Sequence, residues 1–143
     1  MKDTLAFQIS VLYRDFLGYT TARLKELGLS FGQVPLVVYT GKHPGCPQAD
    51  LTRALRLDWG YCQRSIGRLA EGGFLTKAYD SGAACNRLTL TPRGEEAFRL
   101  CHQVFRSWDE QALAGFSPEE TRTLLALLDR LAPEEWEAGC ESV

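Results

Sequence analysis

Two short helical segments joined by a tight turn, with a hairpin pattern directly after them, constrain this chain more than any other feature. The first segment spans residues 47–55, and the second spans residues 59–71 after a break of three residues. Asp58 is placed to cap the start of the second helix, and the pair Gly72-Gly73 is typical of a helix end. Two short helices in this arrangement predict a helix-turn-helix.

The hairpin pattern follows without a linker. Residues 74–79 and 87–91 have the composition and alternation of strands, and the turn between them, residues 81–85, is small and uncharged. Thr91 and Pro92 then form a helix start, because proline is tolerated at the first helical position. The sequence therefore predicts a fold that is mainly α-helical with a small β-hairpin wing, a winged helix-turn-helix.

Long amphipathic helices flank this predicted lobe. Apolar side chains recur at steps of three and four over residues 5–27, again after Pro92, and again after a capping box that begins at Ser117. A further capping box, Ser30 with Gln33, begins the helix that precedes the helix-turn-helix. We therefore expect a single domain over residues 1–143, ending in a frayed acidic tail.

The composition is that of one ordinary globular domain. The chain has 143 residues, 45% of them hydrophobic, and no apolar run approaches the ~18 residues of a membrane span. The N-terminus lacks the layout of a signal peptide, and the five cysteines form no C-x-x-C pair. We therefore expect a cytoplasmic protein with reduced thiols. Because no nucleophile, histidine and carboxylate form a recognisable constellation, we expect neither an enzyme nor a bound cofactor.

Charge is distributed unevenly along the chain. The net charge is −2, but residues 42–93 carry eight Lys or Arg and four Asp or Glu, a net charge of +4 that leaves −6 for the remainder. A basic segment between acidic ends is expected when one face of a protein meets phosphates. Chance variation along a sequence also produces such a difference in charge. The basic segment coincides with the helix-turn-helix, and this coincidence favours nucleic-acid binding.

The second helix of the pair carries the side chains best suited to reading DNA. Gln63 and Arg64 lie opposite its apolar face, and glutamine and arginine are the types that pair with adenine and guanine. Gly60 and Gly67 on the same side weaken a helix but allow another backbone to approach closely.

Three further residues of this helix have two interpretations each. Trp59 and Tyr61 at the helix start either contact DNA or pack against the wing and the preceding helix. Arg68 is either a DNA contact or a solvated arginine beneath the wing.

The order and spacing of these motifs resemble the MarR family of transcriptional regulators. The resemblance extends over about residues 5–132, and its matching segments are residues 48–51, 57–64, 68–69, 71–75 and 88–94. It implies a homodimer formed by helices at about residues 4–27 and 92–132, with a winged helix-turn-helix lobe at about residues 30–93 in each subunit.

The resemblance further implies a repressor that binds a pseudo-palindromic operator in double-stranded DNA and is released by a small, often aromatic, ligand. With the side chains chosen above, the expected DNA-binding set is Gln48, Trp59, Gly60, Tyr61, Gln63, Arg64, Arg68, Lys77 and Arg87. The expected ligand cleft, between the dimerisation and DNA-binding regions, is lined by Tyr13, Phe16, Tyr39 and His43, with Phe105 and Trp108 as further candidates. The alternative for each of these aromatic residues is a plain core or dimer contact.

The chain departs from the family pattern in its wing. Family wings usually carry an acid and an arginine at the positions that Gly82 and Ala84 occupy here. The usual minor-groove arginine is therefore missing, and Arg87 and Lys77 are the basic residues near enough to replace it. Pro47 also stands where the family often has a threonine cap.

Other forms of control and another class of function stay open. Oxidation of Cys85 at the hairpin tip would make the protein a thiol-based redox regulator, although redox-sensing relatives usually keep their cysteine in the N-terminal helix. Metal binding by His43, Cys101 and His102 lacks a motif of diagnostic spacing, so no metal site is predicted. The unusual wing and the two glycines also allow a protein-interaction module on a winged-helix scaffold.

Overall fold

A computed structural model describes residues 1–131, which form six α-helices, one short 3-10 helix and three strands. In chain order these are α1 (Leu5–Lys25), η1 (Phe31–Gln33), α2 (Val34–Lys42), β1 (Cys46–Pro47), α3 (Gln48–Ala54), α4 (Trp59–Glu71), β2 (Leu75–Asp80), β3 (Cys85–Leu90), α5 (Pro92–Ala112) and α6 (Pro118–Asp129). The predicted acidic tail and Cys140 lie outside the described residues. Within that range, no helix is long and apolar enough to cross a membrane.

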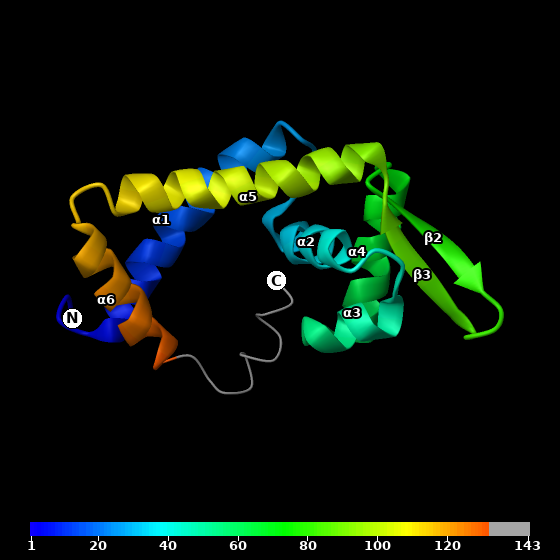
Figure 1. Cartoon of the computed structure of the whole chain (residues 1–143), viewed down its shortest axis with the longest axis horizontal. Coiled ribbons are helices and arrows are strands. Elements are labelled where there is room, and N and C mark those ends of the chain that lie inside the picture. Colours follow the sequence, from blue (N-terminus) through cyan, green and yellow to red (C-terminus); the bar gives the residue numbers. More distant parts are fainter. Residues whose placement is uncertain (132–143) are drawn as a thin grey trace.

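The long helix α5 runs along the molecule and joins its two ends (Figure 1). At one end lie α6 and the first turns of α1, and at the other end α2, α3, α4 and the β2–β3 hairpin gather beneath the start of α5. The hairpin projects outward from this second end, as expected of a wing. The predicted mainly α fold with a winged helix-turn-helix is therefore confirmed.

Side-chain caps set where several helices begin. The reciprocal hydrogen bonds of a capping box are present between Ser30 and Gln33 and between Ser117 and Glu120, as predicted. The first box begins a single 3-10 turn, η1, before the α-helical path of α2 starts at Val34. These caps satisfy N–H groups that a helix leaves unpaired at its start.

The sheet has three strands rather than the two predicted. Its order is β1-β3-β2, with antiparallel pairing throughout, and β2 pairs with β3 from Leu75 opposite Leu90 to Asp80 opposite Cys85. The additional strand β1 contributes two residues, and the N–H of Gly45 beside it donates to the carbonyl of Leu88 at 2.8 Å. Sequence reasoning missed β1 because two residues, one of them a proline, carry no strand pattern.

The core of the winged helix-turn-helix end is built from every element around it. Leu24 of α1, Leu36 of α2, Leu51 of α3, Ile66 of α4 and Leu88 of β3 are all fully buried in one cluster. Because α4 and the wing share this core, their relative placement is fixed by close packing.

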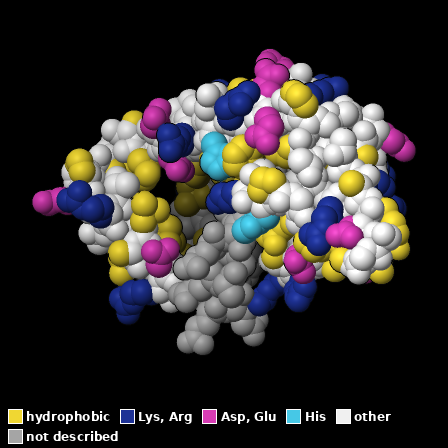
Figure 2. All heavy atoms as spheres, turned by 45° about the vertical axis from the view of Figure 1, so that its right-hand side comes forward, with side chains coloured by type: hydrophobic (Ala, Val, Ile, Leu, Met, Phe, Trp, Pro, Cys, Tyr) yellow, Lys and Arg dark blue, Asp and Glu magenta, His cyan; other side chains and the backbone are white. Residues whose placement is uncertain are grey.

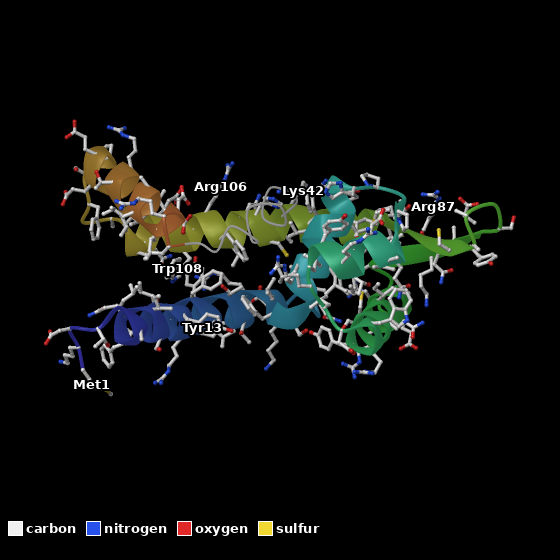
Figure 3. All side chains as sticks on the ribbon, turned by 90° about the horizontal axis from the view of Figure 1, so that it is seen from below. Met1, Tyr13, Lys42, Arg87, Arg106 and Trp108 are labelled. Carbon is white, nitrogen blue, oxygen red and sulfur yellow. The ribbon has the colours of Figure 1, made fainter. Side chains whose placement is uncertain are left out.

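Aromatic contacts join α1 to the far half of α5. The ring of Phe16 meets the rings of Phe105 and Trp108 edge to face, each at 5.1 Å between centroids. The indole N–H of Trp108 donates to Asp15 at 2.8 Å. Figure 3 shows Trp108 on the side of α5 that faces α1.

Candidate nucleic-acid interface

The turn between α3 and α4 fixes how the second helix is presented. Arg56 has a left-handed backbone with φ of 51°, and the N–H of Leu57 returns to the carbonyl of Thr52. The hydroxyl of Thr52 also donates to the sulfur of Cys62 on α4 at 3.0 Å. Asp58 then caps α4 with its carboxylate, as predicted.

Helix α4 buries one face and exposes the other. Cys62, Ile66 and Leu69 are fully buried, as the sequence pattern predicted. The opposite side carries exposed aromatic and polar side chains, which are Trp59, Tyr61, Gln63, Arg64 and Arg68. The predicted DNA-reading side chains therefore stand on the solvent side of a helix that the core holds in place, an arrangement that suits a major groove.

The two glycines of α4 have different surroundings. A Cβ at Gly60 would lie 3.1 Å from Nη1 of Arg64 and 3.2 Å from Oδ2 of Asp58, so this glycine makes room for the Arg64 side chain over the helix start. A Cβ at Gly67 would meet nothing within 4 Å. Both glycines were predicted to let another backbone approach closely. At Gly60, the space that the Arg64 side chain needs is a second explanation, within the protein itself.

The two aromatic residues at the start of α4 lean in different directions. Trp59 is 48% exposed and lines a pocket that also includes Tyr79 and Cys85 of the wing. Tyr61 turns toward η1, where its hydroxyl would lie 2.8 Å from a Cβ at Gly32. Both side chains contact neighbouring elements and keep an exposed surface, so packing and DNA contact are compatible for each.

The arginine expected to replace the minor-groove contact is held within the protein. Nε of Arg87 donates to Oδ2 of Asp80 at 2.8 Å, and its Nη1 donates to the carbonyl of Gly45 at 3.1 Å. Asp80 also accepts from the N–H groups of Gly82 and Ala83 through Oδ1, which fixes the hairpin tip. The hydrogen bond from Arg87 is the main reason that the pKa of Asp80 lies below its usual value.

Asp80 is a functional candidate that sequence reasoning missed. An aspartate directly before Ser81-Gly82 is a recognisable signal for a turn stabilised by its own side chain. Lys77, the other basic residue proposed for the wing, is exposed on β2.

Gln48 does not occupy the position expected of a direct DNA contact. Its side chain is buried, because it is the first residue of α3 and lies under the wing after β1 has paired with β3. Sequence reasoning placed it on the DNA side by motif, and the structure sets it beside residues of α4 and the wing, among them Trp59 and Asn86. Its Nε2 has no hydrogen-bond partner among the described residues.

The aromatic residues expected to line one ligand cleft are divided between two places. Tyr13 and Phe16 line an apolar groove between α1, α5 and α6, together with Phe105 and Trp108. Tyr39 is buried in the core, and its ring lies 4.4 Å from that of His43. The four residues therefore do not line one cleft in the structure, because Tyr39 packs into the core while Tyr13 and Phe16 line the groove.

A separate cavity lies between α2 and α5. It has a volume of about 210 Å³, and its lining residues are Val34, Pro35, Val38, Cys101, His102, Phe105, Arg106 and Asp109. Its wall is mostly apolar and carries ionisable side chains only on α5. The i and i+4 spacing of Val34 and Val38 on α2 is the sequence signal that would have pointed to it.

Three of the thiols are buried and serve mainly for packing. Burial raises the pKa of the Cys46 and Cys101 thiols to about 11, and it also raises that of Cys62. Among residues 1–131 no group of three or more His, Cys, Asp or Glu side chains is placed to hold a metal ion. The metal option of His43, Cys101 and His102 therefore has no geometric support.

Comparisons with known proteins give consistent relatives over nearly the whole chain. The HTH-type transcriptional regulator BilQ of Clostridium symbiosum is 35% identical over 132 residues, which is 92% of each protein. No protein-family model matches the chain.

Solved structures share the fold as well. The crystal structure of MarR is 26% identical, with a TM-score of 0.79, and the match covers 92% of this chain and 90% of that one. A MarR-family regulator from Listeria monocytogenes, solved in complex with a 26mer DNA, is 24% identical with a TM-score of 0.77 and coverage of 99% and 93%. This second likeness concerns the fold alone.

Proposed function

Because the chain belongs to the MarR family of winged-helix, DNA-binding transcriptional regulators, we propose that it acts in the bacterial cytoplasm as a homodimeric repressor of a pseudo-palindromic operator. A small ligand, bound between its dimerisation helices and its DNA-binding lobe, releases it from the DNA. Helix α4, the second helix of the helix-turn-helix, keeps its exposed polar face. This face favours DNA binding over the alternative of a protein-interaction module.

The observation that carries the proposal is the exposed face of α4. Gln63 and Arg64 stand on it, free of the core, while the buried face holds the helix rigidly. Such a helix enters a major groove with side chains that pair with adenine and guanine. The wing lies beside it and brings Lys77 toward the phosphate backbone.

Apolar surface at the end remote from the wing supports the homodimer. The side chains that remain about half exposed there are Leu5, Ile9, Val11, Leu12, Leu125, Leu127, Leu128 and Leu131. Figure 2 shows yellow hydrophobic side chains at the left-hand end, where α6 lies in Figure 1. A surface of this kind on a small protein marks an interface. Two-fold pairing through it would present two α4 helices about 34 Å apart, to successive major grooves.

The cavity between α2 and α5 supports release by a ligand. One wall of the cavity belongs to α2, in the lobe that carries α4, and the other belongs to α5, which leads to the proposed dimer interface. A bound molecule would therefore favour one orientation of the lobe relative to α5. Its apolar wall suits an aromatic ring, and His102 and Arg106 supply polar groups for one end of it. Arg106 points away from α1 in Figure 3.

Selection of bound DNA from a random duplex library by the purified protein tests the proposal. We expect enrichment of a two-fold symmetric site, bound by a dimer in sedimentation equilibrium, and weaker binding when aromatic acids are added. Truncation after Gly115, which removes α6, is expected to give monomer or aggregate. Failure to enrich any sequence would favour the protein-interaction module, and a soluble intact dimer after truncation would contradict the interface.

A further inference from the structure

Helix α4 has a glycine at its second position, beneath a side chain of its exposed polar face. Gly60 follows Trp59, the first residue of α4, and glycine is a poorer helix former than any residue except proline. It stands one helical turn before Arg64, the arginine best suited to reading a base. The surroundings of Gly60 supply a reason for its place.

Two polar side chains converge on the space that a Cβ would take at Gly60. Nη1 of Arg64 would lie 3.1 Å from that atom and Oδ2 of Asp58 would lie 3.2 Å from it, both closer than an ordinary van der Waals contact. Gly67, the other glycine of α4, differs, because a Cβ there would meet nothing within 4 Å. Only the first of the two glycines therefore keeps space open for side chains of the protein.

The position of the Arg64 guanidinium follows from helix geometry. Side chains of an α-helix point back toward its N-terminus, so each one covers the turn that precedes it. For Arg64 that turn holds Gly60, and without a Cβ there the guanidinium lies close against the helix. It thereby reaches the N-terminal part of α4, which is the part of such a helix that contacts base edges.

Asp58 makes this position favourable for a cation. The N-terminus of a helix carries a partial positive charge, which disfavours a guanidinium. The carboxylate of Asp58 accepts the N–H of Tyr61 at 3.0 Å, and the same Oδ2 borders the space beside Nη1 of Arg64. A negative charge therefore stands near the guanidinium and offsets the helix dipole.

We propose that Gly60 is a positioning residue for base recognition, which sets where the Arg64 guanidinium lies so that Arg64 distinguishes one base pair in each half of the operator. The inference rests on the proposed function, which brings α4 into a major groove. Gly60 acts here through Arg64, and not by letting a DNA backbone approach closely. Guanine is the base expected at that pair, because it offers two acceptors to a guanidinium.

A methyl group at position 60 should move the guanidinium without unfolding the helix. The atoms in its way are the ends of two exposed side chains, Arg64 and Asp58, which can rotate aside. Gly60→Ala is therefore expected to unfold at the temperature of the parent or slightly above it. Hydrogen bonds weaken with small changes of distance and angle, so a displaced guanidinium should lose much of its preference for guanine.

A double-mutant cycle on base preference tests the proposal. Each base pair of one operator half is varied, and binding is measured by fluorescence anisotropy at one fixed salt concentration. Gly60→Ala should lower the preference for guanine at one pair by about three- to tenfold, a part of the about 10- to 100-fold that a bidentate contact supplies. In an Arg64→Ala background the same change should alter every base preference by less than about twofold.

Gly67→Ala is the matched comparison on the same helix. It adds the same methyl group in open space, so it measures how far a more stable α4 alone changes affinity. Two results overturn the proposal. One is a base preference that Gly60→Ala leaves unchanged. The other is an equal loss of binding in both backgrounds, which would mean that Gly60 acts on the DNA or on the helix without Arg64.

NMR of the protein without DNA separates the position of Arg64 from the proposed function. We expect nuclear Overhauser contacts between the α-protons of Gly60 and the side-chain protons of Arg64, because Nη1 lies 3.1 Å from the Cβ position of this glycine. Their absence would contradict the proposed positioning whether or not DNA is bound. If the parent selects no DNA sequence, the proposed function fails and the role in base recognition fails with it. If the parent binds its operator and the cycle shows no coupling, this inference fails alone.

Discussion

The guanidinium of Arg87 on β3 lies against the carboxylate of Asp80 on β2, with Nε donating to Oδ2 at 2.8 Å. The pair holds the hairpin closed next to its tip, where Asp80 also accepts two backbone N–H groups. Arg87 additionally ties the wing to the carbonyl of Gly45, just ahead of β1. An uncharged tip therefore coexists with an ordered wing, because the charges that order it lie at the base of the turn.

Replacing Arg87 with leucine should raise the pKa of Asp80 toward its ordinary value. The native carboxyl has a lowered pKa, chiefly because Arg87 donates to its charged form. Its stabilising effect on the wing is therefore complete above the ordinary pKa of an aspartate and is lost as the pH falls through the lowered value. Carbon-detected NMR titration of Asp80 checks this. Lys77→Leu, on the same strand, serves as the control and should leave the titration where it is.

Arg64→Ala should weaken operator binding by about 10- to 100-fold, which corresponds to about 1–3 kcal/mol for a bidentate base contact. The reason is the position of Arg64 on the exposed face of α4, where the core does not use it. Anisotropy at one fixed salt concentration measures the change. Arg122→Ala, an exposed arginine on α6, controls for the loss of one positive charge and is expected to stay within about twofold. Equal affinities for Arg64→Ala and the parent would remove Arg64 from the interface.

The fold was predictable wherever one short segment determined the outcome. The caps at Asp58 and Ser117 and the bounds of α4 are where the sequence placed them, because each depends on neighbouring residues alone. The strand β1 was not predictable, since Cys46 and Pro47 become a strand only when β3 is beside them. Long-range pairing of this kind leaves almost no local pattern.

The residues of the candidate site likewise fall into those that local sequence predicts and those that depend on long-range packing. The exposed side of α4 followed from helical periodicity, so Gln63 and Arg64 were found where expected. The burial of Gln48 depends on how α3, α4 and the wing pack together, and no spacing within α3 specifies that packing. The separation of Tyr39 from Tyr13 depends on the direction of α2 relative to α1, which no spacing within either helix specifies.

Gly94→Ala should destabilise the protein by about 3 kcal/mol or more, because the added Cβ would overlap the carbonyl oxygen of Phe74. Backbone atoms cannot rotate away as a side chain would, and this carbonyl also accepts the N–H of Thr91. Gly67→Ala is the matched control on α4, where a Cβ meets nothing within 4 Å. It should stabilise the helix by up to about 1 kcal/mol. Urea unfolding of both variants measures the two opposite changes, and a common sign would contradict the packing.

Alkaline pH should destabilise the protein through its buried thiols. Burial raises the pKa of the Cys101 thiol to about 11, so the folded state favours the neutral form more than the unfolded chain does. Its contribution to stability is therefore complete below the ordinary thiol pKa and is lost as the pH rises toward 11, at about 1.4 kcal/mol per pH unit for each such thiol.

Cys101→Ala tests this loss, with urea unfolding measured at intervals between pH 8 and pH 11 under reducing conditions. The variant starts from a lower stability, because it leaves a small cavity, but it should lose stability with pH more slowly than the parent. Val104→Ala, at a buried position on the same helix, removes volume without removing a thiol and should keep the steeper slope. Parallel slopes for all three proteins would show that the Cys101 thiol ionises as easily in the folded protein as in the unfolded chain.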